Sequence, residues 1–431
     1  MRSGSDRPVL GLDGDPEQIQ TAVRFARDRR LRPVTKNTGH DLTGRPSAPG
    51  SFQIATHRLK YINYAKDFNP VGSKDEPGVG PAVTLGGGIL GGELYEAAAA
   101  GGYTAIAGLC STVGVAGGFI QGGGLSMLSP ALGLASDNAG KIVTANEYQN
   151  TDLFWALRGG GGGTFGVVVD VTVRVYPATT AVHVTMDSNI TAVDEDFWTV
   201  VSELYAAIPK FSANRNFVKV DFISTVGSIF DSGDIPYTSS SEFIEQISTK
   251  LAANPGFIYG GGIGTLHGSV LISESYAFFA EGPAQMATAF SKLQLRPGDG
   301  IQVASMVTGK VRENGATVQS AIHPSFREAL LFVDLVLGLS STSSAEEQAA
   351  VQNKLTHFQM PQLYALEDHR MASYYNIGNP GEPDFRQAFW GKDNYERLYA
   401  IKHAWDPEGL FVVKLGVGSV DWDEDGMCRV A

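Results

Sequence analysis

Two short stretches of the sequence place a reactive side chain among glycines. Residues 107–124 read AGLCSTVGVAGGFIQGGG and contain Cys110, one of only two cysteines in the 431 residues. Residues 36–44 read KNTGHDLTG and contain His40. Such a cysteine is either a small apolar filler or a nucleophile, and such a histidine is either a turn residue or a functional group. From these residues alone, the filler and the turn residue are the favoured interpretations.

The glycines around these two residues predict binding through the backbone. The chain has 52 glycines, which cluster at 86–92, 101–124 and 159–166. Asn, Thr and Gly after a predicted short strand let successive amides point into one concavity, which suits an anion such as a pyrophosphate. The glycines around Cys110 leave an edge without side chains, against which a flat or extended ligand can lie.

The third glycine run excludes the two commonest nucleotide-binding motifs. GGGGGTFG at 159–166 follows a predicted helical turn and precedes a predicted strand. The dinucleotide fingerprint requires the opposite arrangement, a strand before and a helix after. No GxxxxGKS or GxxxxGKT loop occurs in the sequence. A plain Rossmann or P-loop interpretation therefore fails.

The segments that must position these loops alternate between strand and helix. Residues 8–35 predict strand, helix, strand, with Asp15 as the helix N-cap and Pro16 as the first helical residue. From about residue 178 onward, strand-like and helix-like segments interleave, which predicts a separate α+β domain. Further predicted elements are a buried strand at 82–88, an alanine-rich helix and a strand at 93–110, and a strand at 163–177.

Length, composition and charge describe an acidic globular protein, most simply of two domains. The net charge of −12 and the pI of about 5.2 argue against a nucleic-acid or anionic-membrane surface. No window holds about 18 consecutive apolar residues, and residues 1–30 lack the apolar region of a signal peptide. Two cysteines cannot form a disulfide framework, and a single Cys110–Cys428 bridge is less favoured than free thiols.

Several motifs together resemble one family, the berberine-bridge-enzyme-like flavoproteins. This family belongs to the vanillyl-alcohol-oxidase superfamily with a PCMH-type FAD-binding domain. The resemblance covers nearly the whole chain, and the NTGHD form of the loop is most similar to the fungal secondary-metabolism members. Family members usually carry a further segment before the strand that corresponds to PVLGL here, so the chain is expected to be shorter than they are. The motifs, in order, are KNTGHDLTGR, AVTLGGGILGGELYEAAAAGG, GLCSTVGVAGGFIQGGG, LGLASDN, TDLFWALRGGGGGTFGVVVDVTVRVYP and YYN followed by FWGKDNYERLYAIKHAWDPEGLF.

The resemblance implies a bound FAD with two covalent links. His40 corresponds to the residue linked to the 8α-methyl of the isoalloxazine, and Cys110 to the residue linked to its 6-position. Two links would raise the reduction potential of the flavin and fix the ring against the substrate. No metal is expected. The other cofactor-binding residues that the resemblance implies are Lys36, Asn37, Thr38, Gly39, Asp41, Gly108, Thr112, Gly114, Gly117, Gly118, Asn138, Val143, Gly166, Val168 and Asn376.

The catalytic residues are less well marked by the motifs. Tyr374 of the YxN motif is the first candidate for a base or proton relay. Asp368 and His369 follow, although a solvated charge pair is the favoured role for those two. Phe119 and Leu125 stand where the family usually has polar residues, so two polar groups near the flavin are expected to be missing.

The sequence thus predicts an α+β protein with a PCMH-type FAD-binding domain at 1–177. A substrate domain at 178–370 would have an antiparallel sheet covered by helices, and residues 371–431 would return to the FAD domain. We expect the site between the domains. The expected function is an oxidoreductase that moves a hydride from a small organic biosynthetic intermediate, polyketide or alkaloid-like, to the flavin, with dioxygen as the final acceptor. Alternatives are a non-redox cyclisation, cycloaddition or isomerisation, and, less favoured, flavin binding without catalysis.

Overall fold

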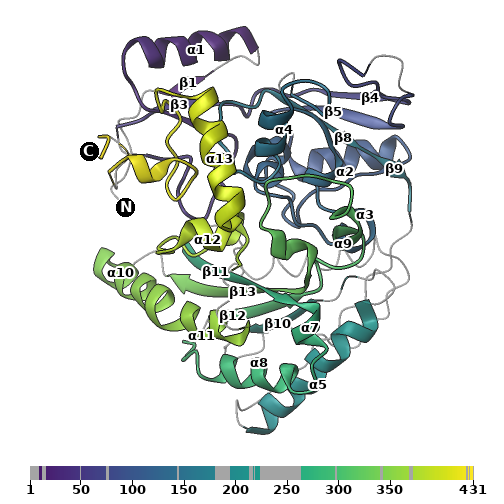
Figure 1. The fold of residues 1–431 in the computed structure, drawn as a ribbon, viewed down its shortest axis with the longest axis vertical. Helices are drawn as coiled ribbons and strands as arrows, with labels where there is room; N and C mark the ends of the chain where they lie inside the picture. The colour runs from purple at the N-terminus through teal and green to yellow at the C-terminus, as the bar shows by residue number, and fades with distance from the viewer. Residues whose placement is uncertain are drawn as a thin grey trace, which may run out of the picture.

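In the part of the chain that the computed structural model describes, the strands form three larger sheets and a two-stranded one (Figure 1). Within the same residues, no helix combines the length and the apolar composition that crossing a membrane requires. The described residues are 9–11, 16–48, 50–73, 77–142, 145–179, 195–212, 217, 219–223, 264–296, 299–339, 343–367, 372–423, 426 and 428–430.

The N-terminal sheet is parallel and small. Its strands lie in the order β1 (Val9–Gly11), β3 (Phe52–Ala55), β2 (Pro33–Lys36). Helix α1 (Pro16–Asp28) covers it, because its Ile19 and two alanines are buried against the apolar side chains of β3. The strand, helix and strand expected at 8–35 are therefore confirmed, and β2 leads directly into the loop that carries His40.

The second sheet is antiparallel and holds the buried strand expected at 82–88. Its order is β4 (Ile62–Ala65), β5 (Ala82–Gly86), β8 (Asp170–Arg174), β7 (Ala139–Ile142). Val83 and Leu85 of β5 are fully buried, as a central strand requires. Helices α2 (Gly91–Ala100) and α4 (Thr151–Leu157) contribute to the same core. The two-stranded sheet pairs β6 (Tyr103–Thr104) with β9 (Tyr176–Pro177).

The third sheet is antiparallel and is covered by helices on one face, as expected for the substrate domain (Figure 1). Its order is β10 (Lys219–Ile223), β12 (Gly300–Ala304), β13 (Ala329–Leu339), β11 (Gly264–Ser273). Odd-numbered residues of β12 and β13, such as Val303 and Val333, pack against these helices. Even-numbered residues point the opposite way, because side chains alternate along a strand. The covering helices are α5 (Glu195–Ser212), α8 (Gly282–Ser291), α10 (Ala345–Lys354) and α11 (Met360–Tyr364).

The C-terminal helices pack beside the second sheet. Helices α12 (Phe385–Trp390) and α13 (Lys392–Trp405) bury Trp390 and Leu398 in the core that also holds α4.

The boundary expected at 177 and 178 lies next to residues 180–194, which are outside the described part, so it stays a prediction. The remaining helices are α3 (Ser129–Leu132), α7 (Glu274–Ala277), α9 (Lys310–Asn314), two short π-helical segments (Val115–Phe119, Leu355–Gln359) and 3₁₀ turns at Ser136–Asn138, Pro324–Arg327, Ala365–Glu367, Tyr375–Ile377 and Ser419–Asp421.

Packing around the third glycine run requires glycine at position 159. Gly159 has a φ of +135°, its carbonyl accepts a hydrogen bond of 2.9 Å from Trp390 Nε1, and a Cβ there would overlap the backbone nitrogen of Ile322. We expect Gly159→Ala to lower the free energy of unfolding by about 2–4 kcal/mol, because backbone strain and overlap add together.

The control for this variant is Gly102→Ala. Gly102 also has a positive φ, +73°, but a Cβ there would have no atom within 4 Å. It should therefore cost only the left-handed backbone strain, about 1–2 kcal/mol. Thermal unfolding measures both variants, and equal losses would contradict the packing argument.

Candidate functional site

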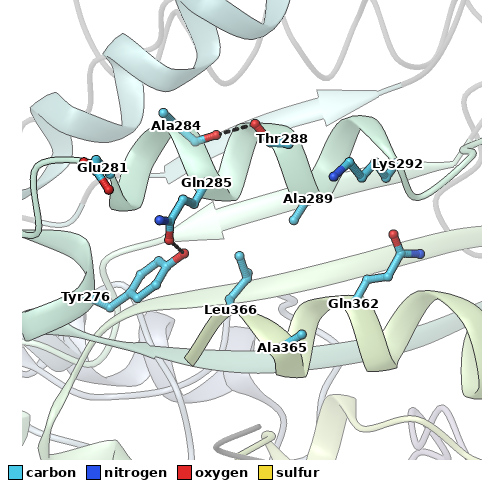
Figure 2. Close-up of a pocket in the computed structure, with 10 residues that line it drawn as sticks. All are labelled: Tyr276, Glu281, Ala284, Gln285, Thr288, Ala289, Lys292, Gln362, Ala365 and Leu366. Carbon is cyan, nitrogen blue, oxygen red and sulfur yellow. Dashed lines mark hydrogen bonds between the residues drawn. The ribbon is translucent and has the colours of Figure 1, made fainter. Parts of the chain in front are cut away.

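A cavity of about 950 Å³ brings together the loops that the sequence singled out. Its walls come from the loop after β2, the glycine run around Cys110, the segment at 374–377 and the cavity-facing side of the third sheet. The volume lies at the upper end of the range of small-molecule and cofactor sites. A second hollow, of about 480 Å³, lies between α8 and residues 362–366 (Figure 2) and contains none of the predicted site residues.

Asp41 shapes the loop that carries His40. Its carboxylate accepts hydrogen bonds from the backbone N–H of Thr43 (3.0 Å) and of Arg45 (2.9 Å), and it pairs with the Arg45 guanidinium at 3.0 Å. Burial opposes the charged carboxylate, but Arg45 and these N–H donors outweigh it and lower the pKa of Asp41. Arg45 also donates to the carbonyl of Tyr375 at 3.1 Å and stacks on its ring. The His40 loop is thereby fixed to the C-terminal segment.

The side chains of His40 and Cys110 both contact the hydroxyl of Thr112. The Nε2 of His40 lies 2.7 Å from Oγ1 of Thr112, and the Sγ of Cys110 lies 3.3 Å from the same oxygen. All three side chains line the cavity. Cys110 and Cys428 are both free, so the Cys110–Cys428 bridge is wrong, and Cys110 is exposed rather than buried as an apolar filler would be.

The glycines after Cys110 form a ledge without side chains. A Cβ on Gly114 would overlap the amide nitrogen of Asn37, which donates to the carbonyl of Gly87 at 2.6 Å. The π-helical segment that follows is broken at Gly117, where ψ is −142°. Gly114, Gly117 and Gly118 therefore present backbone alone to the cavity.

Four residues of the cavity wall have a buried polar atom without a hydrogen-bond partner among the described residues. The atoms are Thr35 Oγ1, Asn37 Oδ1, Gln121 Oε1 and Tyr375 Oη. A buried polar atom without a partner costs free energy, and native proteins rarely keep one. A polar ligand in the cavity would satisfy these atoms, so the wall fits a cofactor with hydroxyl and N–H donors. Among the described residues, no group of His, Cys, Asp and Glu side chains could hold a metal ion.

The structure brings most of the predicted site residues to this cavity. Lys36, Asn138 and Gly166 do not line it. Val143, Asp368 and His369 lie outside the described residues. The predicted residues that line the cavity are Asn37, Thr38, Gly39, His40, Asp41, Gly108, Cys110, Thr112, Gly114, Gly117, Gly118, Val168, Tyr374 and Asn376.

Asn138 is occupied by bonds within the protein instead. Its amide nitrogen donates to the carbonyls of Leu132 (3.1 Å) and Leu134 (2.8 Å), and its oxygen accepts the hydroxyl proton of Tyr176. These bonds hold the turn before β7, which explains an asparagine at this position without any ligand.

Tyr374 has the chemistry of a proton donor at neutral pH. Its hydroxyl oxygen accepts hydrogen bonds from the amide of Asn376 (2.7 Å) and from the N–H of Leu125 (3.3 Å). Burial raises the pKa of Tyr374 further above the ordinary value of 10.0. Phe119 and Leu125 line the same region of the cavity, and both are apolar, as the sequence indicated.

Sequence reasoning missed two polar residues on the third sheet, His267 of β11 and Asp334 of β13. Both line the cavity, and the ring nitrogen Nδ1 of His267 lies 3.0 Å from each carboxylate oxygen of Asp334. Burial opposes a charged imidazole, but the charge and the hydrogen bond of Asp334 outweigh it and raise the pKa of His267. The available signal was an aspartate in the middle of the apolar run ALLFVDLVLGL at 329–339.

The comparisons with known proteins identify the family of this chain. The family described as "Berberine and berberine like" matches residues 373–418, and the "FAD binding domain" family matches residues 14–146. The chain is 40% identical to the flavin-dependent oxygenase ucdF of Aspergillus ustus over 459 residues, which cover 96% of this chain and 82% of the relative. It is also 40% identical to the FAD-linked oxidoreductase malF of Malbranchea aurantiaca, over 96% of this chain and 76% of the relative.

A solved structure shows the same fold. The VAO-type flavoprotein MtVAO615 of Myceliophthora thermophila C1 superimposes with a TM-score of 0.76 at 26% identity, over 98% of this chain and 82% of that one. The fold and the cavity thus define an FAD-binding oxidoreductase of the VAO type. Within that class, the chain belongs to the berberine-bridge-enzyme-like FAD-linked oxidoreductases.

Proposed function

We propose that this enzyme holds its FAD through both His40 and Cys110 and oxidises a small organic biosynthetic intermediate, with dioxygen as the final electron acceptor. The observation that carries the proposal is the Thr112 hydroxyl, which contacts both side chains although they stand seventy residues apart. Two nucleophiles close together on the wall of a cofactor-sized cavity are what a doubly linked flavin requires.

Different residues of the cavity hold different parts of the cofactor. His40 contacts Thr112 through Nε2, which leaves Nδ1 as the nitrogen for the link. The ledge of Gly114, Gly117 and Gly118 accepts a flat ring at backbone distance. Asn37 Oδ1 and Gln121 Oε1 accept hydrogen bonds from the cofactor.

Bound FAD supplies the hydride acceptor of the reaction. The third sheet contributes lining residues to the same cavity, and this side of the sheet positions the substrate. Tyr374 donates a hydrogen bond or relays a proton, because its raised pKa keeps the phenol protonated. The lining comes from all three segments, 1–177, 178–370 and 371–431, which supports the proposed division into an FAD domain, a substrate domain and a returning C-terminal segment.

The test is denaturation of the purified holoenzyme. We expect flavin fluorescence to stay with the precipitated chain, and the intact mass of the chain to exceed the sequence mass by one FAD. Complete release of the flavin into the supernatant would contradict the proposal of covalent attachment. Anaerobic mixing with a panel of aromatic alcohols and amines should bleach the visible flavin band, and admission of dioxygen should restore it.

A second candidate function is a non-redox cyclisation, cycloaddition or isomerisation on the same scaffold. The observation that favours it is the apolar wall of Phe119, Leu125 and Phe332, which offers a substrate shape rather than polar groups. This function predicts anaerobic turnover without bleaching of the flavin band. Bleaching by substrate in a single turnover favours the oxidase.

A further inference from the structure

His267 and Asp334 form a pair on the sheet face that closes the cavity. In the antiparallel register of β11 and β13, Asp334 lies opposite Ser269. His267 is two residues before Ser269 and therefore faces the same side of the sheet. Both side chains line the same cavity as His40 and Cys110.

The hydrogen bonds of the pair fix which nitrogen of His267 is basic. Both carboxylate oxygens of Asp334 lie 3.0 Å from Nδ1, and the Asp334 side chain is only 3% exposed. An ionised carboxylate only accepts hydrogen bonds, so Nδ1 carries a proton. In the neutral imidazole Nε2 is then the nitrogen with the lone pair, and it lies 3.1 Å from the hydroxyl of Thr265, which is the donor in that form.

The other titratable groups of the cavity are less suited to accept a proton. Asp41 is committed to Arg45 and to backbone N–H groups. Tyr374 keeps its proton because burial raises its pKa. The titratable groups that line the cavity together with His267 are Asp334, Tyr374, Tyr375, Arg45, Asp41, His40 and Cys110.

We propose that His267 is the base that accepts the substrate proton at Nε2, and that Asp334 is its positioning residue. This inference rests on the proposed function. The substrate is an alcohol or amine, whose O–H or N–H replaces the Thr265 hydroxyl as the donor to Nε2. Its proton moves to Nε2 while a hydride leaves the adjacent carbon for the flavin, so that C=O or C=N forms. Dioxygen then takes up the hydride and the proton, which gives hydrogen peroxide and restores neutral His267.

The pair predicts the direction of the pH dependence. Only neutral Nε2 accepts a proton, so flavin reduction should become faster as the pH rises through the pKa of His267. Asp334 raises that pKa above the ordinary value of 6.5, because its negative charge stabilises the imidazolium. In Asp334→Asn the rise should therefore move to lower pH. An unchanged pH profile in this variant would contradict the positioning role.

One test needs no substrate. Holoenzyme labelled with carbon-13 histidine is titrated by NMR, and the His267 signal is identified by its loss in His267→Gln. The signal should titrate above about pH 6.5 in the native enzyme and at lower pH in Asp334→Asn. A His267 signal that titrates at the same pH in both proteins would overturn the pairing.

The second test measures reduction directly. The probes are secondary aromatic alcohols and amines, mixed anaerobically with the holoenzyme, and the visible flavin band is followed. His267→Gln keeps a donor for Asp334 and should slow bleaching by about 10²–10⁴-fold, the usual contribution of a general base. His357→Gln makes the same change at an exposed histidine that does not line the cavity and should bleach at the native rate.

The outcomes separate this inference from the proposed function. If the native enzyme carries covalent flavin and is bleached, but His267→Gln is bleached equally fast, the base assignment is wrong and the oxidase remains. If no probe bleaches the native enzyme and its flavin is released on denaturation, the proposed function fails, and the NMR titration still decides whether Asp334 tunes His267. Covalent flavin retained in His267→Gln shows that the variant is folded.

Discussion

Replacing both His40 and Cys110 with alanine is expected to give a protein whose flavin separates completely from the chain on denaturation. Each single variant removes one of the two proposed links, so the flavin should stay with the denatured chain in both. The reason is that both side chains line one cavity and contact the same Thr112 hydroxyl. Intact-mass measurement of the three variants gives the result directly.

The loss of one link should also change the flavin itself. We expect each single variant to have a lower reduction potential than the native enzyme, because covalent attachment raises it. Equilibration with redox dyes measures the difference. Cys428→Ala is the matched control, since Cys428 is the other free, exposed cysteine and does not line the cavity. A single variant that released all of its flavin would show that the remaining residue forms no link.

The two loops that carry His40 and Cys110 could be singled out from the sequence because their residue patterns are local. The predicted anion-binding loop at 36–44 continues directly from β2, and the glycines around Cys110 fall within one short stretch, residues 108–124. Backbone conformations of this kind depend on residues a few positions apart. The resemblance to the family then predicted His40 and Cys110 as the two attachment residues, which the residues alone had not done.

The contact between His267 and Asp334 on the third sheet could not be predicted in the same way. His267 and Asp334 are 67 residues apart, and they meet only because β11 and β13 pair in one particular register. A shift of that register by one residue would turn one of the two side chains to the helix-covered face. The same reason explains Asn138, whose contact with Tyr176 spans 38 residues and fixes a turn rather than a ligand.

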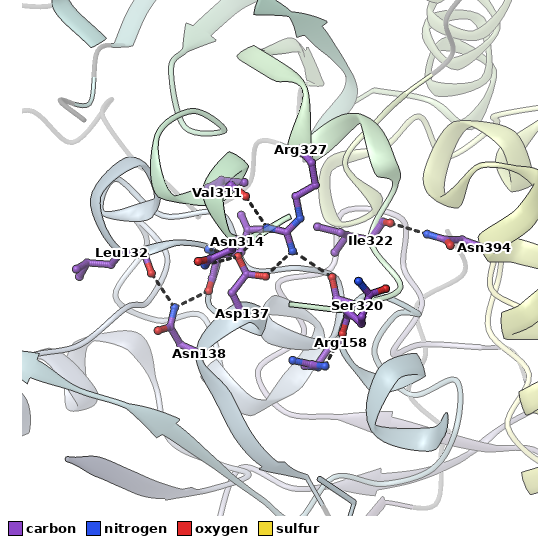
Figure 3. Close-up of polar contacts among 12 residues, drawn as sticks. Leu132, Asp137, Asn138, Arg158, Val311, Asn314, Ser320, Ile322, Arg327 and Asn394 are labelled. Carbon is purple, nitrogen blue, oxygen red and sulfur yellow. Dashed lines mark hydrogen bonds and ion pairs between the residues drawn. The ribbon is translucent and has the colours of Figure 1, made fainter. Parts of the chain in front are cut away.

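A second long-range contact, a buried ion pair, joins the turn before β7 to the segment after α9 (Figure 3). The guanidinium of Arg327 meets both carboxylate oxygens of Asp137, at 2.8 and 2.6 Å. The Asp137 side chain is 0% exposed and also accepts hydrogen bonds from Asn314 (3.1 Å) and from the N–H of Leu134 (3.2 Å). The pair therefore connects residues of the predicted FAD and substrate domains.

Arg327→Met is expected to lower the free energy of unfolding by about 3–5 kcal/mol, because it leaves the buried carboxylate of Asp137 without its cation. Thermal unfolding of the holoenzyme measures the loss. Arg312→Met is the matched control. Arg312 pairs with Glu274, but these side chains are 37% and 36% exposed, so the same substitution should cost only about 0–1 kcal/mol.

The double variant Asp137→Asn/Arg327→Met shows whether the loss of stability comes from the unpaired charge of Asp137 or from the lost contacts of the Arg327 side chain. In Asp137→Asn/Arg327→Met the charge is gone, while an asparagine oxygen still accepts from Asn314 and Leu134. We therefore expect the double variant to be more stable than Arg327→Met alone, since an uncompensated buried charge costs more than a neutral amide. If the double variant is instead the less stable of the two, the cost lies in the contacts of the Arg327 side chain with Val311 and Ser320 and not in the charge of Asp137.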